Sequence, residues 1–160
     1  MKKVGLFVSL VAMLLFVAGA ASLALAAEPK DVQKFEKTFP FDENVTHPVG
    51  ITVGDATIES VKVRNWPDAE DYQKAQKNPN DTKSMYVVFT YSNKGPITYK
   101  CKFTVTVLDP AGGAPFAVDD SKKDLDKNKA SDTDSFFVKM KTNLYKEAKT
   151  FKVNFEVWKK

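Results

Sequence analysis

Cysteine and histidine are almost absent from the sequence, which has one of each among 160 residues. A disulfide scaffold needs paired cysteines and a structural zinc site needs several Cys or His ligands, so both classes are excluded. Seven glycines and eight prolines are too few for a collagen-like chain, and a 43% hydrophobic content is too high for a wholly disordered one. What remains is an ordinary globular protein, whose activity the composition does not reveal.

The N-terminus has the three parts of a secretory signal. Two lysines precede an uncharged, mostly apolar stretch over residues 4–27, which ends in small residues that include Ala24 and Ala26. We predict cleavage after Ala26, so that residues 1–26 are removed and the protein works in the periplasm or outside the cell of a bacterium. An uncleaved anchor is the alternative, because about 20 apolar residues span a bilayer. Only in that case do we expect attachment to a membrane.

Neither sign of charge dominates the chain, which has 24 basic and 20 acidic residues. Removing residues 1–26 lowers the formal net charge from +4 to +2, since that segment carries two lysines and no acidic residue. Such a domain lacks the basic footprint of a nucleic-acid-binding protein. We therefore expect no nucleic-acid partner.

Alternating apolar and polar residues predict β-strands after the signal. In Tyr99–Val107 every odd position is apolar and every even position is Lys or Thr, and Phe151–Val157 repeats the alternation. Wound as helices, these stretches would leave half of their apolar side chains in water, at a cost of about 1.5–3 kcal/mol each. Residues 85–91 and 136–140 alternate in the same way and predict two more strands. Weaker or shorter runs at residues 51–53, 56–64 and 116–119 predict three others.

The remaining segments define the predicted architecture. The alternation slips by one residue near Glu59–Ser60, which predicts a β-bulge. A short helix is predicted within Pro67–Asp81, and Asn143–Glu147 reads as the link of an antiparallel hairpin between the last two strands. Residues 27–48 show no sustained period and are predicted to be an N-terminal extension. Residues 49–160 are then an all-β, antiparallel immunoglobulin-like β-sandwich of about seven strands with one short inserted helix.

Two stretches carry a family resemblance. Tyr86–Gly95 (YVVFTYSNKG) followed by Phe103–Gly112 (FTVTVLDPAG) resembles the bacterial exported immunoglobulin-like domains of the FxLYD and DUF4352-type families. There a strand ending in Asn-x-Gly leads to a strand ending in Leu-(Tyr)-Asp-x-x-Gly, whereas here Leu108 is followed directly by Asp109. The likeness extends over about residues 50–158. It implies a sandwich fold and supplies no shared catalytic residues.

Two residue types could carry nucleophilic or acid–base chemistry. Cys101 lies on the apolar side of its predicted strand, which favours core packing, with an intermolecular disulfide or a reactive thiol as the alternatives. His47 precedes Pro48 before the first predicted strand and is interpreted as a loop residue. No G-x-S-x-G motif supplies a nucleophile for it.

Six aspartates crowd the segment Asp119–Asp134. Asp124, Asp126 and Asn128 have the spacing of the start of a calcium loop. Lys129 then occupies the position of the required glycine, and Ser135 that of the bidentate glutamate. We interpret the segment as a solvated linker, with a calcium site as the alternative.

Four aromatic residues lie off the main core pattern or in the connecting segment: Trp66, Tyr72, Tyr86 and Trp158. They predict either a small secondary core or an exposed patch that stacks on a sugar or anchors a partner protein.

The sequence thus supports one main hypothesis of function. It describes an exported, non-enzymatic immunoglobulin-like module that binds or scaffolds an envelope or extracellular protein or glycan. No catalytic, cofactor-binding or metal-ligating residue is assigned, and no cofactor is expected. The alternatives are a glycan hydrolase that uses two carboxylates and an adhesin-like domain stabilised by calcium.

Overall fold

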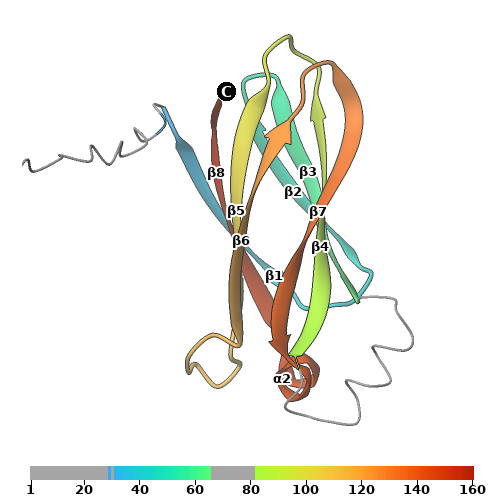
Figure 1. Ribbon diagram of the computed structural model, residues 1–160, viewed down its shortest axis with the longest axis vertical. Coiled ribbons are helices and arrows are strands. Elements are labelled where there is room, and N and C mark those ends of the chain that lie inside the picture. The colour runs from blue at the N-terminus through green and yellow to red at the C-terminus, as the bar shows by residue number, and fades with distance from the viewer. Residues whose placement is uncertain (1–28, 30, 66–81) are drawn as a thin grey trace, which may run out of the picture.

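The computed structural model describes residues 29, 31–65 and 82–160 of the chain. Within them the chain forms eight strands and one short helix, packed as two layers (Figure 1). In chain order the elements are β1 (Gln33–Pro40), β2 (Thr46–Val53), β3 (Ala56–Asn65), β4 (Thr82–Asn93), β5 (Tyr99–Val107), β6 (Ala117–Leu125), β7 (Lys129–Lys141), α2 (Thr142–Glu147) and β8 (Thr150–Lys159). The predicted signal and the helix predicted within Pro67–Asp81 lie outside the described residues.

The strands form two four-stranded sheets. Sheet A has the order β1-β8-β5-β6, sheet B has the order β2-β3-β4-β7, and neighbouring strands run antiparallel. The predicted all-β antiparallel sandwich is therefore confirmed, with eight strands in the described residues instead of about seven. The strand order differs from the A-B-E-D and C-F-G sheets of immunoglobulin constant domains, so the likeness is one of architecture.

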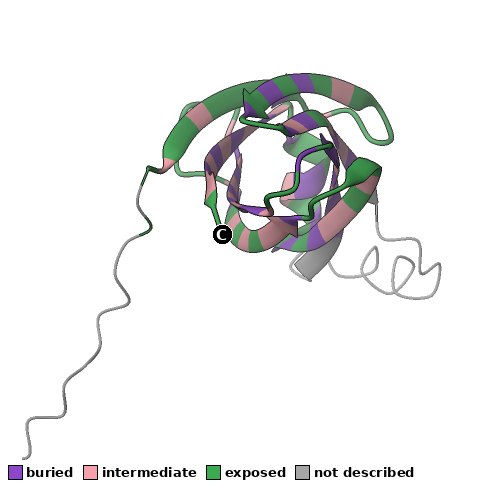
Figure 2. Ribbon diagram, turned by 90° about the horizontal axis from the view of Figure 1, so that it is seen from above, coloured by how far each residue is buried: buried purple, intermediate pink, exposed green. Residues whose placement is uncertain are grey.

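Alternating burial along the strands produces the core. All five odd-numbered residues of β5 are buried and the four even-numbered ones are half-buried, as predicted. In β8 the residues Phe151, Val153, Phe155 and Val157 are buried in the same way. Figure 2, which looks down on the sandwich, shows buried and exposed residues alternating along the strands around the core.

Phenylalanine rings from both sheets meet at the centre of the core. Phe89 of β4 stacks on Phe103 of β5 with ring centroids 3.9 Å apart, and Phe155 of β8 meets both rings edge-on. Phe136 of β7 stacks on Phe89 from within sheet B at 5.7 Å. Aromatic contacts of this kind add about 0.5–1.5 kcal/mol each to the energy of burial, so this cluster ties one sheet to the other.

The predicted bulge in β3 is confirmed. Ile58 pairs with Tyr91 while Ser60 pairs with Thr90, so β3 has one extra residue, Glu59, opposite β4. The extra residue restores the inward direction of the apolar side chains that follow, and Val61 and Val63 are fully buried.

A buried asparagine, Asn93, lies at the end of the sandwich where the β4–β5 and β6–β7 connections meet. The fully buried side chain of Asn93 donates from Nδ2 to the carbonyl oxygens of Ile97 (2.8 Å) and Leu125 (2.9 Å). Its Oδ1 accepts a hydrogen bond from the backbone N–H of Gly95 at 3.3 Å. Asn128 adds a backbone bond to the carbonyl oxygen of Gly95 at 3.1 Å. One side chain thus connects two loops.

The prediction of an N-terminal extension over residues 27–48 is wrong from Gln33 onward. β1 pairs along its whole length with β8, and β2 begins at Thr46. The alternation does not predict β1, because Lys37 stands between Phe35 and Phe39 at a position that should be apolar. On this edge strand the side chain of Lys37 stays exposed. β2 contains Pro48 and a bulge after it, where Gly50 adopts a φ of 67°.

Two connections also differ from the prediction. The supposed linker Asp119–Asp134 falls mostly within β6 and β7, with only residues 126–128 between these strands. The last two strands do not form a hairpin: β7 belongs to sheet B and β8 to sheet A, and α2 joins them across the end of the sandwich (Figure 1). α2 anchors itself by burying Tyr145. No helix in the described part of the chain is long and apolar enough to cross a membrane.

Candidate functional site

The predicted aromatic patch is not a single surface in the part that the structure describes. Tyr86 lies on the outer face of sheet B, because its neighbours Met85 and Val87 point into the core. Its ring contacts Phe137 of β7 at 4.2 Å between centroids. Trp158 lies on the outer face of sheet A, on the opposite side of the sandwich. Trp66 and Tyr72 lie outside the described residues.

Trp158 stands on a face that is mostly polar, with Val118 of β6 as an exposed apolar residue. It is half-buried next to Lys100 of β5, its partner in the strand register. Among the described residues its indole ring has no hydrogen bond and no aromatic contact. Tyr86, in contrast, contacts another aromatic ring. Of the two patch residues that the structure describes, Trp158 is thus the one whose ring is not stacked on another aromatic ring.

Cross-strand register arranges the outer face of sheet A in rows. One row places Lys34, Glu156 and Lys102 side by side on β1, β8 and β5. The next row consists of Glu36, Asn154, Thr104 and Asp120, on β1, β8, β5 and β6. Charged groups thus stand at both ends of the second row, and two uncharged polar groups stand in its middle.

Three ion pairs surround the two uncharged groups. They join Lys34 to Glu156 (3.7 Å), Lys152 to Glu36 (3.2 Å) and Lys102 to Asp120 (3.9 Å). Pairs that are this exposed contribute little stability, about 0–1 kcal/mol each. Their effect on the surface charge matters more than their effect on stability. Each pair neutralises its own two charges, and the two side chains point toward one another.

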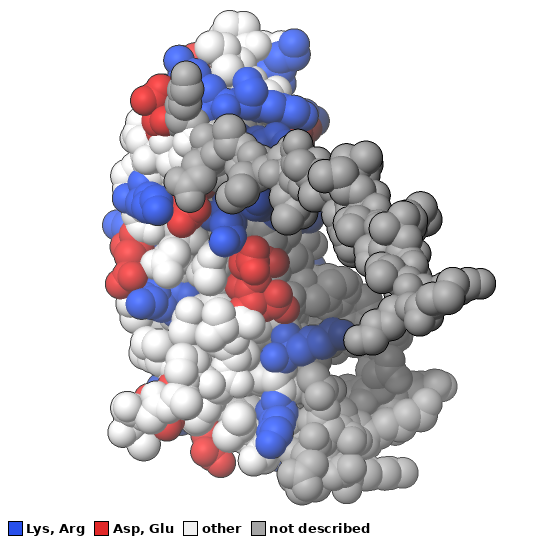
Figure 3. Space-filling model, turned by 60° about the vertical axis from the view of Figure 1, so that its left-hand side comes forward, with Lys and Arg blue, Asp and Glu red and all other residues white. Residues whose placement is uncertain are grey.

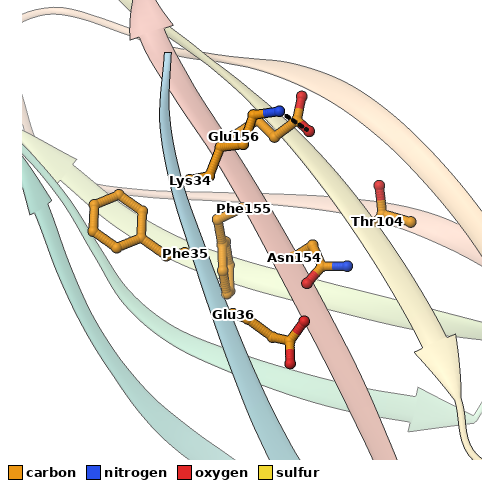
Figure 4. A pocket seen from close by; sticks show the side chains of 7 residues that line it. All are labelled: Lys34, Phe35, Glu36, Thr104, Asn154, Phe155 and Glu156. Atoms are coloured by element: carbon orange, nitrogen blue, oxygen red, sulfur yellow. Dashed lines mark ion pairs between the residues drawn. The ribbon is translucent and has the colours of Figure 1, made fainter.

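A depression of about 370 Å³ opens between β1, β8 and β5 (Figure 4). It is lined by Lys34, Phe35, Glu36, Thr104, Asn154, Phe155 and Glu156. In Figure 4 Asn154 lies between the Lys34–Glu156 ion pair and Glu36, with Thr104 beside it. The side chains of Asn154 and Thr104 have no hydrogen bond to any described residue, so the amide and the hydroxyl are available to a ligand.

Two carboxylates, Glu36 and Glu156, line the same depression. Both are partly solvated, with 59% and 36% of their side-chain surface exposed, and each is paired with a lysine. A glycosidase instead places its acid in an apolar, desolvated setting and holds its two carboxyl groups across the scissile bond. The depression is therefore better suited to binding polar groups than to acid–base chemistry.

Cys101 is fully buried on β5, and the prediction of core packing is confirmed. Burial in the apolar core raises the pKa of its thiol far above the ordinary range, and the nearby charge of Glu156 raises it further. A thiol in this state is a poor nucleophile.

His47 belongs to β2, so the interpretation as a loop residue is wrong. Its ring packs near Phe39 (5.6 Å between centroids) and Phe151 (6.2 Å), and its Nε2 is buried without a hydrogen bond. The imidazole therefore packs as an aromatic side chain.

Four of the six aspartates of Asp119–Asp134 pair with lysines. Asp134 contacts Lys123 at 2.7 Å and Asp132 contacts Lys129 at 3.0 Å. The hydrogen bond from Lys129 is the main cause that lowers the pKa of Asp132. Within the described ranges no three His, Cys, Asp or Glu side chains gather as a metal site would require.

Charge is mixed on the face of the molecule that Figure 3 shows. On the face seen in Figure 3, basic and acidic side chains are interspersed among uncharged ones. A ligand selected by this surface is therefore recognised by local geometry more than by a long-range field.

Sequence reasoning missed the residues that line the depression. Lys34 and Glu36 stand in the segment interpreted as an extension, and their strand was not predicted. Asn154 and Thr104 were placed correctly on the polar sides of their strands, but only the pairing of β5 with β8 makes them neighbours. The alternation shows which residues point outward from a strand. Their neighbours on the next strand depend on the register, and the register joins parts of the chain that are far apart in sequence.

Comparison with known proteins adds no identity: no family model and no curated protein sequence matches the chain.

Proposed function

We propose that this chain is an exported, non-enzymatic binding module of a bacterium, which binds or scaffolds an envelope or extracellular partner. The observation that carries the proposal is the depression on sheet A, where Asn154 and Thr104 have no hydrogen-bond partner among the described residues and are surrounded by ion pairs. The burial of Cys101 and the packing of His47 support a role without nucleophilic catalysis. The immunoglobulin-like family resemblance of residues 50–158 agrees with it and stays a prediction.

Export rests on the N-terminal segment. We expect residues 1–26 to be removed, with membrane attachment only if cleavage fails. Fractionation of the producing bacterium followed by mass measurement of the intact protein tests this. A mature chain that begins at Ala27 in the periplasm or medium supports it, and a full-length chain in the cytoplasm contradicts it.

Binding is tested by capture. The tagged protein is incubated with an envelope extract, and bound components are identified by mass. The double variant Thr104→Lys/Asn154→Lys fills the depression with two cations, and Thr90→Lys places one cation on the outer face of sheet B as a control. Capture by the wild type and the control, but not by the double variant, supports the proposal. No specific capture by the wild type contradicts it.

A glycan hydrolase remains a second candidate because Glu36 and Glu156 line one depression. It requires release of reducing sugar from a glycan, and loss of that release in both Glu36→Gln and Glu156→Gln. A wild-type protein that binds glycan without cleaving it favours the binding module.

A further inference from the structure

We infer that the outer face of sheet A from Trp158 to Asn154 is a binding surface for an uncharged saccharide chain. This inference rests on the proposed binding function and names the chemical class of its ligand.

The first argument concerns hydrogen bonding. Asn154 offers both a donor and an acceptor, and the hydroxyl of Thr104 offers both in one group. Neighbouring hydroxyls of a sugar present the same mixture of donors and acceptors. Because the two side chains face each other across paired strands and have no hydrogen-bond partner among the described residues, they can contact adjacent hydroxyls of one ring.

The second argument concerns charge. The outer face carries nearly equal numbers of lysines and acidic residues, and the ones next to Asn154 are already paired: Lys34 with Glu156, Lys152 with Glu36, and Lys102 with Asp120. Next to Asn154, an anionic ligand would have to displace Glu36 or Glu156 from its lysine, and a cationic ligand would have to displace a lysine from its carboxylate. An uncharged polar ligand fits between the pairs without breaking them.

The third argument concerns the aromatic ring. Trp158, Glu156 and Asn154 share the outer face of β8 at every second position. At about 3.4 Å per residue, the Cα atoms of Trp158 and Asn154 lie about 14 Å apart. A chain of a few sugars can span this interval, with one ring stacked on the indole and another bonded to Asn154. A half-buried indole without an aromatic neighbour offers the apolar body that the C–H face of a sugar contacts.

The test is affinity electrophoresis of the purified full chain in native gels. Separate gels contain the uncharged polysaccharides hydroxyethylcellulose, laminarin, dextran and galactomannan, and one gel contains the anionic polysaccharide alginate. We expect at least one uncharged polysaccharide to slow the wild type, with less than a twofold change in affinity when sodium chloride is raised tenfold. Trp158→Ala and Asn154→Ala should each weaken binding at least tenfold, while Thr90→Ala on sheet B leaves it unchanged.

Three results overturn the inference: no uncharged polysaccharide slows the wild type, alginate alone does so, or both variants bind as the wild type does. Circular dichroism melts of the variants show that they fold, so a loss of binding can be assigned to the surface. A wild type that captures an extracellular protein but no uncharged polysaccharide refutes the saccharide and leaves the binding module standing. A wild type that captures neither refutes both.

Discussion

Replacing Asn93 by alanine should cost a large part of the stability of the domain. The substitution leaves the carbonyl oxygens of Ile97 and Leu125 and the N–H of Gly95 without their partner. Each buried polar group that loses its hydrogen bond costs about 1–3 kcal/mol. The bonds to Leu125 and Gly95 are buried and count in full, whereas that to Ile97 is only partly buried and is partly replaced by water. We expect a loss of about 3–5 kcal/mol in the free energy of unfolding.

Urea unfolding followed by circular dichroism measures this loss. With a slope of about 2 kcal/mol per molar, a loss of 4 kcal/mol lowers the midpoint by about 2 M. Asn154→Ala is the matched control, because the same amide is removed from a half-buried site with no hydrogen bond among the described residues, and its effect should stay within about 0.5 kcal/mol.

Asn93→Asp separates the loss of hydrogen bonds from the loss of volume. The aspartate has the same shape, but its carboxylate would face the two carbonyl oxygens that the amide donates to. At pH 7 this variant should therefore be at least as unstable as Asn93→Ala. A loss below about 1 kcal/mol in both variants would refute the role assigned to Asn93.

Three further predictions concern the core, the thiol and the acidic strands. Phe103→Asp buries an unpaired carboxylate in the aromatic cluster and should abolish the cooperative thermal transition. Thr104→Asp, one residue away on the outer face, should retain the transition. The reverse order of stability would contradict the faces assigned to the two residues. Cys101 should react with a chromogenic disulfide only as fast as the protein unfolds. Because burial raises the pKa of its thiol in the folded state, the contribution of the thiol to stability should fall as pH rises above about 9. The variant Cys101→Ala should reduce this alkaline loss of stability. Calcium and a chelator should leave the melting temperature unchanged, since Asp124 of the candidate calcium loop already pairs with Lys160 and no metal-ligand cluster occurs in the described residues. An increase with calcium would revive the adhesin-like alternative.

The sequence was informative where one side of a strand is buried along its whole length. β5 and β8 were predicted correctly because both lie in the interior of sheet A and alternate without interruption. The bulge at Glu59 was predicted for the same reason: the alternation resumes after one extra residue. In these elements the burial of one side determines which positions are apolar, so the sequence alone reveals the strand.

Edge strands and long connections follow other constraints. β1 and β6 each have one neighbour in sheet A, and on these edge strands Lys37 and the half-exposed residues of β6 interrupt the alternation. The hairpin predicted for the last two strands assumed that close neighbours in the chain pair with each other. β8 instead pairs with β1 and β5, far away in the chain. The depression depends on these distant pairings, and its lining therefore could not be derived from local pattern.

The position of β8 between β1 and β5 sets the order in which the protein can be completed. Among the described residues β1 pairs with β8 alone, so the first described strand has no neighbour in its sheet until the last one has been made. A growing polypeptide that emerges N-terminus first therefore holds β1 unpaired until almost the whole chain has been synthesised. Closing so long an interval is slow, since its entropy must be lost before the contacts form. If the chain is exported through a translocon as an extended thread, as we propose, this delay helps to keep the chain unfolded until it has crossed the membrane.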